Sequence, residues 1–420
     1  MMPNQQRVEL QMPFRPEYLP LATGCVEQAV QAYGMGRGEA MHLALAVEEV
    51  YSFLANRTVS GQRLRLSCRF AGYYAEVVCR FQRGGLPVEA FNITATVSSD
   101  DEKSLDEMGL LLAARTVDQL RISAEEAEMG IHFIKEKVYP PAKERLTDFV
   151  ATGPFRPSEP EAELLKQFAV RVCSRYGVKT PPPFQYPGKL ADMVRFGEYG
   201  AVLLVDGKGN VGAGMLWHCR NKMAEAYGPF VFCDQPRLAT QGLEACLAKL
   251  ARQGLLCLVV QQPPLEMPDG FFEPLEACGT VLYRQLEEDN GSVAYIHPDI
   301  ADFYRAETQR LFLPRQLHPT LRQGEAGSPR SAFSVRMNRP AGQVLLTALW
   351  VGDDAAVVLQ QHVAALRQAG FSEIAFQLDA GEASQAELAP ALSAGGFVPR
   401  YILPWGGRGD VLVWTQREEA

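Results

Sequence analysis

Two pairs of similar segments, each separated by the same distance, constrain the fold of this chain more than any other feature of its sequence. The segments LARQG and LRQAG end at Gly254 and Gly370, and the segments PLEACGTV and PALSAGGFV begin at Pro274 and Pro390. Both separations are 116 residues, and two landmarks that share one offset are harder to obtain by chance than one. A repeat of this length predicts a duplicated domain rather than a solenoid of short units.

Prolines and changes in pattern divide the chain into three blocks. The first block ends at KVYPPAKERL, where two prolines stop a strand-like run, and the third begins near residue 292. The predicted domains are therefore 1–140, 141–291 and 292–420. A chain of 420 residues is too long for one ordinary hydrophobic core, which agrees with this division.

The composition is that of a folded globular protein that does not bind nucleic acid. Hydrophobic residues make up 47% of the chain and charged residues 21%, which excludes a disordered chain. The net charge is −8, whereas broad binding to a phosphate backbone needs a basic surface. No apolar run has the length of a membrane span, and the N-terminal residues lack the apolar centre of a signal peptide. We therefore expect a cytoplasmic protein that does not bind a membrane.

The nine cysteines favour free thiols over disulfides or a metal site. None of them forms a CxxC spacing, and several lie within apolar runs. Buried free cysteines are common in a reducing cytoplasm, and structural zinc sites usually show paired cysteines at short spacing. The sequence therefore predicts no disulfide and no bound metal.

Hydrophobic patterns and turn residues predict mixed helices and strands in the second and third blocks. In the second block, Ser158 and Glu161 have the spacing of a capping box before an amphipathic helix. A hairpin is expected around residues 206–210, followed by a strand, a helix over 238–254, a strand and a short helix in DGFFEPLEACG. The third block predicts a similar succession of two strands, a helix over 355–370, a strand, a helix and two terminal strands.

The first block carries a long amphipathic helix with two adjacent glutamates. In AMHLALAVEEVYSFLANRT, residues 40–58, an apolar stripe runs beside Glu48 and Glu49. A helix is expected before this segment, and a strand pair, the helix SLDEMGLLLAARTVDQLRI and a last strand are expected after it. This order resembles the GHKL ATPase fold, in particular the small anti-sigma-factor serine kinases, over roughly residues 15–140.

The resemblance implies a two-layer α/β sandwich with a degenerate nucleotide site. Glu49 falls on the family's glutamate, but Phe53 stands where an asparagine helps to hold magnesium and phosphate. The segment FQRGGLP, with Gly85, lacks the family's adenine-binding aspartate, and the last helix keeps Gly109 but has Leu111 in place of a second glycine. The residues left for such a site are Glu49, Gly85 and Gly109, so ATP with magnesium and serine kinase activity are disfavoured.

Glu48 and Glu49 have a second interpretation, because paired glutamates often lie on the solvated side of a packing helix. On this interpretation the first block keeps the packing of the family and has lost its ligand contacts. The resemblance then implies a domain that binds a protein partner, such as a sigma factor or its antagonist, or that forms a homodimer.

The second block resembles the GNAT acyltransferases in the order of its elements and in one loop. The family's signature turn has an arginine or glutamine and two small residues, and it opens a helix that binds the pyrophosphate of coenzyme A. In PRLATQGLEACLAKL, Arg237 and Gly242 match the first and last positions, while Thr240 replaces the middle glycine. The resemblance implies acetyl-CoA as cofactor, with its pyrophosphate held by Arg237, Thr240, Gln241 and Gly242. The same residues also fit an ordinary loop and helix start.

A candidate catalytic base in the second block is Glu225, on the strand MAEAYGPF. The family often has a glutamate there that takes a proton from an amine through water, although the position also suits an exposed strand residue. His218 and Tyr227 are further polar groups nearby. In the third block, Asp353 and Asp354 precede the corresponding helix, where they would repel a phosphate but suit a helix N-cap. The third block is therefore expected to be structural.

Two further segments carry basic and aromatic residues. Arg305, Arg310 and Arg315 lie in a largely helical run, where we expect a solvated helix face. Trp405 precedes two glycines between two strands, which indicates a tight hairpin beside a core tryptophan or, alternatively, a ligand pocket.

The expected fold class is α+β, with a GHKL-like two-layer α/β sandwich followed by two GNAT-like mixed-sheet α/β domains. Two functions remain open. The first is an acyl-CoA-dependent N-acetyltransferase that acts on a small-molecule amine and carries an anti-sigma-like regulatory domain. The second is a non-catalytic regulator in which all three domains bind a protein partner or a small ligand.

Overall fold

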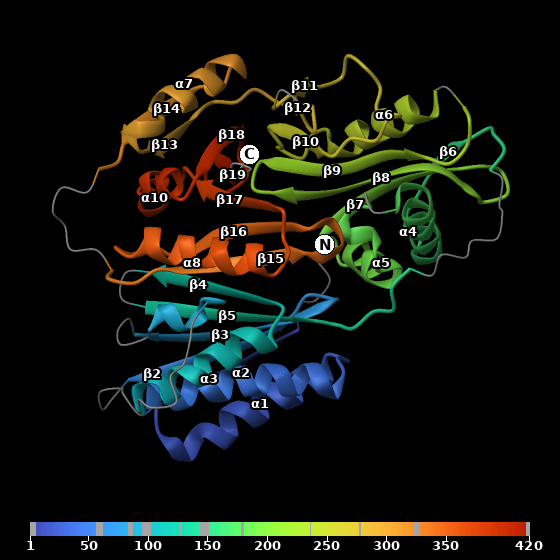
Figure 1. The fold of residues 1–420 in the computed structure, drawn as a ribbon. Helices are drawn as coiled ribbons and strands as arrows, with labels where there is room; N and C mark the ends of the chain where they lie inside the picture. Colours follow the sequence, from blue (N-terminus) through green and yellow to red (C-terminus); the bar gives the residue numbers. More distant parts are fainter. Residues whose placement is uncertain are drawn as a thin grey trace. The chain divides into compact units, whose positions relative to one another are not determined.

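The computed structural model describes residues 6–55, 62–82, 87–94, 102–125, 128–142, 151–177, 180–235, 237–276, 279–321 and 328–416. Helices and strands are interspersed along the chain, so the protein belongs to the α+β class (Figure 1). The chain divides into two compact units. The first unit is Met1–Val138, Ala326–Arg336 and Leu346–Gly370, and the second is Tyr139–Glu325, Met337–Leu345 and Phe371–Ala420. The three domains at 1–140, 141–291 and 292–420 stay a prediction.

The first unit contains a five-stranded antiparallel sheet with the strand order β1-β2-β3-β5-β4. Its strands are β1 (Arg7–Pro13), β2 (Arg63–Phe70), β3 (Tyr74–Gln82), β4 (Gln119–Glu125) and β5 (Glu128–Glu136). The helices of this part are η1 (Pro16–Tyr18), α1 (Leu19–Ala32), α2 (Arg37–Ala55), η2 (Val88–Phe91) and α3 (Glu102–Thr116). Figure 1 shows α1, α2 and α3 on one side of the sheet.

The core of this unit lies between these helices and one face of the sheet. Leu43, Val47 and Val50 form a buried stripe along α2, which confirms the predicted amphipathic helix. They pack in one cluster with alternate strand residues such as Val77 and Phe133. Because side chains alternate across a strand, the residues between these point to the opposite face of the sheet.

Two strands of this sheet were not predicted from the sequence. In β1 only Met12 is buried, so the alternation that signals a half-buried strand is missing. β4 begins at Gln119, within a segment predicted as the end of a helix, but α3 ends at Thr116. Pairing with β5 decides the conformation of this segment, and local propensity does not report such pairing.

The second unit contains a seven-stranded sheet with the order β11-β12-β10-β9-β8-β7-β6. Its strands are β6 (Arg156–Ser158), β7 (Tyr199–Val205), β8 (Val211–Arg220), β9 (Met223–Val231), β10 (Cys257–Gln261), β11 (Glu273–Pro274) and β12 (Val281–Gln285). Only β9 and β10 run parallel among these neighbours. The helices are α4 (Ala162–Tyr176), η4 (Pro182–Phe184) and α5 (Pro187–Arg195) on one face and α6 (Leu238–Leu250) on the other.

The structure confirms the predicted hairpin at residues 206–210 and corrects two other predictions in this sheet. Ser158 ends β6, and α4 has Glu161 as N-cap without a side-chain cap hydrogen bond, so the capping box is wrong. The short helix predicted in DGFFEPLEACG is also wrong, because this segment contains the strand β11. The proline of β11 explains the difference, since the residue before a proline is pushed toward extended backbone.

The remaining strands form a parallel pair and a five-stranded sheet. β13 (Ser292–Ile296) pairs with β14 (Arg315–Pro319), with η5 (Pro298–Ile300) and α7 (Ala301–Arg310) between them in sequence. The five-stranded sheet has the order β15-β16-β17-β19-β18. Its elements are β15 (Ala332–Asn338), η6 (Arg339–Ala341), β16 (Gln343–Trp350), α8 (Ala355–Gln368), β17 (Glu373–Asp379), α9 (Ala383–Ala386), α10 (Ala389–Ala394), β18 (Phe397–Leu403) and β19 (Val411–Gln416). The boundary between the two units falls within β15 and within β16.

The seven-stranded and five-stranded sheets share one order of connection. In the first, β9 leads through α6 to β10, and β12 lies between β10 and β11. In the second, β16 leads through α8 to β17, and β19 lies between β17 and β18. In both sheets, the strand that comes last in the sequence, β12 or β19, lies beside the strand that follows the helix, β10 or β17. A duplication of one ancestral segment would produce this shared order.

A buried arginine holds two loops of the second unit. α7 ends at Arg310, but Arg315 opens β14 and its side chain is 0% exposed, so the expected solvated face is wrong for this residue. Its guanidinium donates to both carboxylate oxygens of Asp410, at 2.8 and 3.0 Å, and to Asp289 at 2.8 Å. The indole of Trp405 is buried and donates to Asp289 at 2.9 Å. These contacts make Trp405 a core residue with a polar partner.

Candidate functional site

The parallel strands β9 and β10 share hydrogen bonds over only part of their length. Their pairing ends at Ala226 and Val260, whereas β9 continues to Val231. β10 ends at Gln261, so the second half of β9 continues past the end of β10 and leaves it beside the crossover helix α6. In sheets with crossover helices, ligands commonly bind at the carboxyl ends of the strands, where neighbouring strands part.

A bulge bends β9 within this separated part. The register between β8 and β9 shifts between Gly214 and Leu216, opposite Gly228. Gly228 has a φ of 104°, and a Cβ at this position would lie 2.9 Å from the carbonyl oxygen of Gly214. Glycine is required here because an added side chain would meet both strained backbone and a fixed neighbour.

The start of α6 has the properties of an anion-binding helix end. Arg237 is the exposed N-cap residue, Thr240 is half-buried, Gln241 is exposed and Gly242 is buried. The first turn contains no acidic residue, and the first N–H groups of a helix lack helical acceptors. A Cβ at Gly242 would lie 3.8 Å from Cβ of Pro229, an ordinary contact, so packing alone does not require glycine there.

Glu225 lies in a cluster of side chains from three adjacent strands. The hydroxyl of Tyr227 donates to Oε1 of Glu225 at 3.1 Å, and Nε2 of His218 lies 3.6 Å from Oε2. The ring of Tyr199 lies 5.1 Å from the imidazole. Burial and, after it, the charge of Glu225 raise the pKa of Tyr227 well above its ordinary value, so the phenol stays protonated. The side chain of Glu225 is only 15% exposed, unlike a freely solvated strand residue.

Glu225 and the start of α6 lie on opposite faces of the seven-stranded sheet. Tyr227, which shares a face with Glu225, packs with α4 and α5, whereas Ala224 and Ala226 pack with α6. Side chains two residues apart share a face, and adjacent ones do not. A ligand could therefore contact both Glu225 and α6 only through the opening where β9 leaves β10.

The corresponding helix α8 lacks this anion-binding character. Asp354 is its N-cap residue, as expected, but the carboxylate makes no cap hydrogen bond and instead lies 3.3 Å from Nη1 of Arg330. A negative charge at a helix N-terminus disfavours a bound phosphate. The two crossover helices thus differ in the charge at their first turn.

Two of the three residues predicted for a degenerate nucleotide site lie in contact. A side chain at Gly109 of α3 would overlap Oε2 of Glu49 on α2. Burial and, to a lesser extent, the charge of Glu48 raise the pKa of Glu49. Phe53, at the position of the missing asparagine, is buried in the core, and Gly85 lies outside the described residues. The solvated helix face predicted for the glutamates therefore holds for exposed Glu48 but not for half-buried Glu49.

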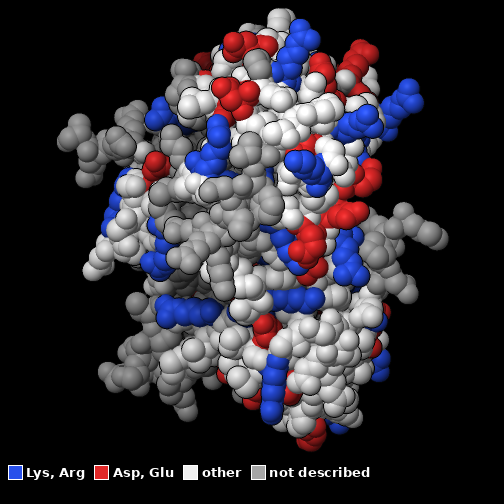
Figure 2. Space-filling model, turned by 90° about the vertical axis from the view of Figure 1, so that its right-hand side faces the viewer, with Lys and Arg blue, Asp and Glu red and all other residues white. Residues whose placement is uncertain are grey.

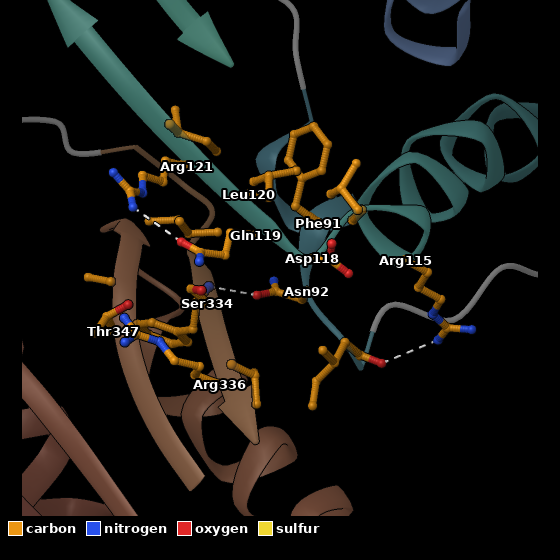
Figure 3. A pocket seen from close by; sticks show the side chains of 18 of the residues that line it. Phe91, Asn92, Arg115, Asp118, Gln119, Leu120, Arg121, Ser334, Arg336 and Thr347 are labelled. Carbon is orange, nitrogen blue, oxygen red and sulfur yellow. Dashed lines mark hydrogen bonds between the residues drawn. The ribbon is translucent and has the colours of Figure 1, made fainter. Parts of the chain in front are cut away.

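The first unit also contains a cavity of 420 Å³ that sequence reasoning did not identify. All residues that line it belong to the first unit. Figure 3 shows β4 on one side of the cavity and β15 and β16 on another. The labelled polar side chains around it are Asn92, Arg115, Asp118, Gln119, Arg121, Ser334, Arg336 and Thr347.

Asn92 connects two walls of this cavity. Its amide donates to the carbonyl of Ser331 at 2.9 Å and accepts from the backbone N–H of Phe333 at 2.9 Å (Figure 3 shows the second bond). These partners stand 239 and 241 residues away in the sequence. No local pattern could have indicated the cavity, because its walls come from distant segments.

The described ranges contain no membrane-spanning helix, no cluster of metal-binding side chains and only free thiols. None of the helices there has the length and apolar character needed to cross a membrane. No group of three or more His, Cys, Asp or Glu side chains there is placed to hold a metal ion. The cysteines in these ranges are free thiols, which confirms that prediction for them. Figure 2 shows basic and acidic side chains interspersed over the described part of one face.

Comparisons with known proteins give weak structural similarity and no match by sequence family. No family model matches the chain, and no curated protein matches it. The chain is similar to a crystal structure of an acetyltransferase of the GNAT family from Staphylococcus aureus Mu50, with 12% identity and a TM-score of 0.27. The match covers 32% of this chain and 100% of that chain. A TM-score of this size does not establish a common fold. The resemblance of the first block to GHKL ATPases has no support among these findings.

Proposed function

We propose that the second unit is an acyl-CoA-dependent N-acetyltransferase whose site lies where β9 separates from β10. The observation that carries this proposal is the end of the parallel pairing at Ala226 and Val260, after which β9 continues to Val231, a residue that packs with Leu238 and Ala239 of the first turn of α6. A thin acyl chain fits such an opening, and the pyrophosphate end of a cofactor fits a helix N-terminus without acidic residues.

The residues at the start of α6 suit the pyrophosphate of acetyl-CoA. Arg237 is exposed and, within the described ranges, makes no ion pair that would compete with a phosphate. Backbone N–H groups of the first turn and the hydroxyl of Thr240 would add donors. When bound, acetyl-CoA supplies the activated acetyl group. Gln241 and Gly242 would contribute through their position in this turn.

Glu225 would accept the proton of the attacking amine. Its carboxylate is held by the hydroxyl of Tyr227 at 3.1 Å and lies 3.6 Å from His218. A base fixed in this way keeps its orientation when an amine, or a water next to it, donates a proton. The proposed acceptor is a small-molecule amine that approaches Glu225 from the face covered by α4 and α5.

We propose a regulatory part for the first unit. The buried Phe53 supports a domain that has lost ATP with magnesium as ligand. A sigma factor or its antagonist as partner, and dimerisation through this part of the chain, rest on the resemblance to the anti-sigma kinases alone. The alternative function is a non-catalytic regulator in which the second unit binds a ligand or partner without turnover.

Thermal unfolding with separate additions of acetyl-CoA and of ATP with magnesium tests these proposals. A ligand at 100 times its Kd adds about 2.7 kcal/mol, which shifts the midpoint by a few degrees. We expect a shift with acetyl-CoA only. Arg237→Ala should abolish it, whereas Lys249→Ala, in the last turn of the same helix, should keep it.

Transfer of the acetyl group to an amine then separates the enzyme from the non-catalytic regulator. We expect Glu225→Gln to lower the transfer rate by about 10²–10⁴-fold while leaving the acetyl-CoA shift in place. A shift without any transfer to a panel of amines would favour the non-catalytic function. If acetyl-CoA leaves the midpoint unchanged, the acyltransferase proposal is wrong.

A further inference from the structure

A serine, a histidine and a glutamate form a hydrogen-bonded row across the sheet of the first unit. Ser123 lies on β4, His132 on β5 and Glu76 on β3, and these strands are neighbours. Oγ of Ser123 lies 3.0 Å from Nε2 of His132, and Nδ1 of His132 lies 3.0 Å from Oε1 of Glu76. This is the order of an activated nucleophile: a hydroxyl, a base, and a carboxylate that orients the base.

The row lies on the face of the sheet that points away from α1, α2 and α3. The neighbouring residues Val77, Ile131 and Phe133 belong to the core on the helix side, so the alternate residues face the other way. The side chain of His132 is 18% exposed, and Ser123 is half-buried. The hydroxyl and the imidazole are therefore outside the hydrophobic core, on side chains that are partly exposed.

Glu76 is held in its ionised form. Nη2 of Arg69 lies 2.7 Å from Oε2 of Glu76, on the side opposite His132. Burial alone would raise the pKa of Glu76, but the hydrogen bond from His132 and the charge of Arg69 outweigh it and lower the pKa to about 2. An ionised carboxylate at Nδ1 favours the tautomer in which Nε2 accepts a proton from the serine hydroxyl.

A glycine on the neighbouring strand accommodates the serine hydroxyl. Gly130 is the cross-strand partner of Ser123. A Cβ at Gly130 would lie 2.5 Å from Oγ of Ser123, 3.5 Å from Nε2 of His132 and 3.7 Å from Cγ of Arg80. The hydroxyl of Ser123 thus already occupies the space that a side chain at position 130 would need, and glycine at this position lets the hydroxyl stay beside His132.

The cavity in Figure 3 begins two residues along the same strand. Arg121 lines it and is the cross-strand partner of His132. Two residues of a strand span about 7 Å, which separates the backbone of Arg121 from that of Ser123, and Nη2 of Arg121 donates to Oε1 of Gln119 at 3.1 Å. Arg115 also lines the cavity, and the carboxylate of Asp118 is already bonded to Nζ of Lys135 at 3.0 Å. The cavity therefore favours an anionic group.

We propose that Ser123, His132 and Glu76 hydrolyse a small carboxylic ester that carries a negative charge, with the charge held by Arg121. Oγ of Ser123 attacks the carbonyl carbon while its proton passes to Nε2 of His132. The carbon–oxygen bond to the alcohol breaks, and the alcohol leaves with that proton. Water then attacks the acyl-serine and gives its proton to His132. Release of the acid returns the proton to Ser123.

The intact chain is tested with 4-nitrophenyl hemisuccinate, an anionic ester, and with neutral 4-nitrophenyl acetate. We expect Ser123→Ala to lower kcat for the anionic ester by about 10³-fold or more and Glu76→Gln to lower it as well. Ser67→Ala is the matched control, since Ser67 is a buried serine on the neighbouring strand β2 and takes no part in the row. Arg121→Ala should raise KM for the hemisuccinate and leave KM for the acetate unchanged.

A fluorophosphonate reagent gives a result that does not depend on any variant. We expect mass spectrometry of the native protein to show the adduct on Ser123 and to show none after heat unfolding. An adduct on another residue only, or equal ester hydrolysis by the wild type and a folded Ser123→Ala variant, would overturn the proposal. Failure of this test leaves the acyltransferase proposal untouched, because the two sites belong to different units.

Discussion

Single residues show how far charge is buried in this molecule. Arg315 donates to Asp289 and to both oxygens of Asp410, and these three side chains are 0–5% exposed. Tyr304 adds a hydrogen bond to Asp410 at 2.6 Å. These side chains depend on one another. Removal of any one of them would leave a buried charge or hydrogen-bonding group without its partner.

Replacing Arg315 by methionine should therefore be costly. The substitution removes the cation and leaves two buried carboxylates facing each other, so we expect a loss of about 3–5 kcal/mol in the free energy of unfolding. Urea denaturation measures it. Arg305→Met is the control, because the partner of Arg305, Asp302, is fully exposed, and it should change stability by less than about 0.5 kcal/mol. Equal midpoints for the two variants would contradict the expectation.

Glu49 should make stability depend on pH. Its pKa is raised in the folded chain by burial and then by the charge of Glu48, so the folded state holds a proton more tightly than the unfolded state. Stability from this group is therefore lost as the pH rises through the raised pKa. We expect Glu49→Gln to be more stable than wild type at pH 7 and equal to it below the ordinary pKa of glutamate. Denaturant midpoints at both pH values test this, and Glu244→Gln, at an exposed position of α6, should show no such difference.

The bulge in β9 depends on one glycine, which leads to a prediction about stability. The bulge in β9 places Gly228 at a φ of 104°, with the Gly214 carbonyl in the way of any Cβ. Gly228→Ala combines backbone strain with a clash against fixed backbone, so we expect a loss of about 2 kcal/mol or more. Thermal unfolding measures it. The matched control is Gly207→Ala, where an added Cβ meets nothing within 4 Å; a similar loss in both variants would mean that the bulge is not specifically strained.

Elements with local signals could be predicted from the sequence, and those set by pairing could not. The stripe of α2 and the hairpin between β7 and β8 have clear periodicity and turn residues. β1 and β11 lack such signals, since the first buries a single residue and the second is two residues long. Their conformation comes from partners elsewhere in the sheet, and local propensity does not report those partners.

The candidate sites divide in the same way. The start of α6 and Glu225 could be proposed from the sequence because their residue types occur in a recognisable order along the chain. The faces of the sheet on which they lie could not be predicted, because they depend on the pairing of the strands. The row of Ser123, His132 and Glu76 has no signature of this kind. It depends on the registers of β4 with β5 and of β5 with β3, which bring residues up to 56 positions apart into hydrogen-bonding distance.

At the scale of the whole molecule, each compact unit combines segments that lie far apart in the sequence. The repeat at an offset of 116 residues indicated a duplication, and the two sheets with matching strand order are consistent with it. Punctuation by proline and glycine could not reveal that Ala326–Arg336 and Leu346–Gly370 join the first compact unit. Their membership depends on contacts such as those of Asn92 with Ser331 and Phe333.

The late segments of the first unit delay the completion of its fold during synthesis. A ribosome that adds about 5–20 residues per second needs roughly 10 to 50 seconds to travel from Val138 to Gly370. Until residues 331–333 are made, the amide of Asn92 lacks the carbonyl of Ser331 and the N–H of Phe333, and until β15 and β16 are made the cavity beside β4 lacks its second wall. The N-terminal sheet therefore lacks its later partners in the first unit while Tyr139–Glu325 is translated. Whatever the cavity binds can therefore be bound only after β15 and β16 have been synthesised.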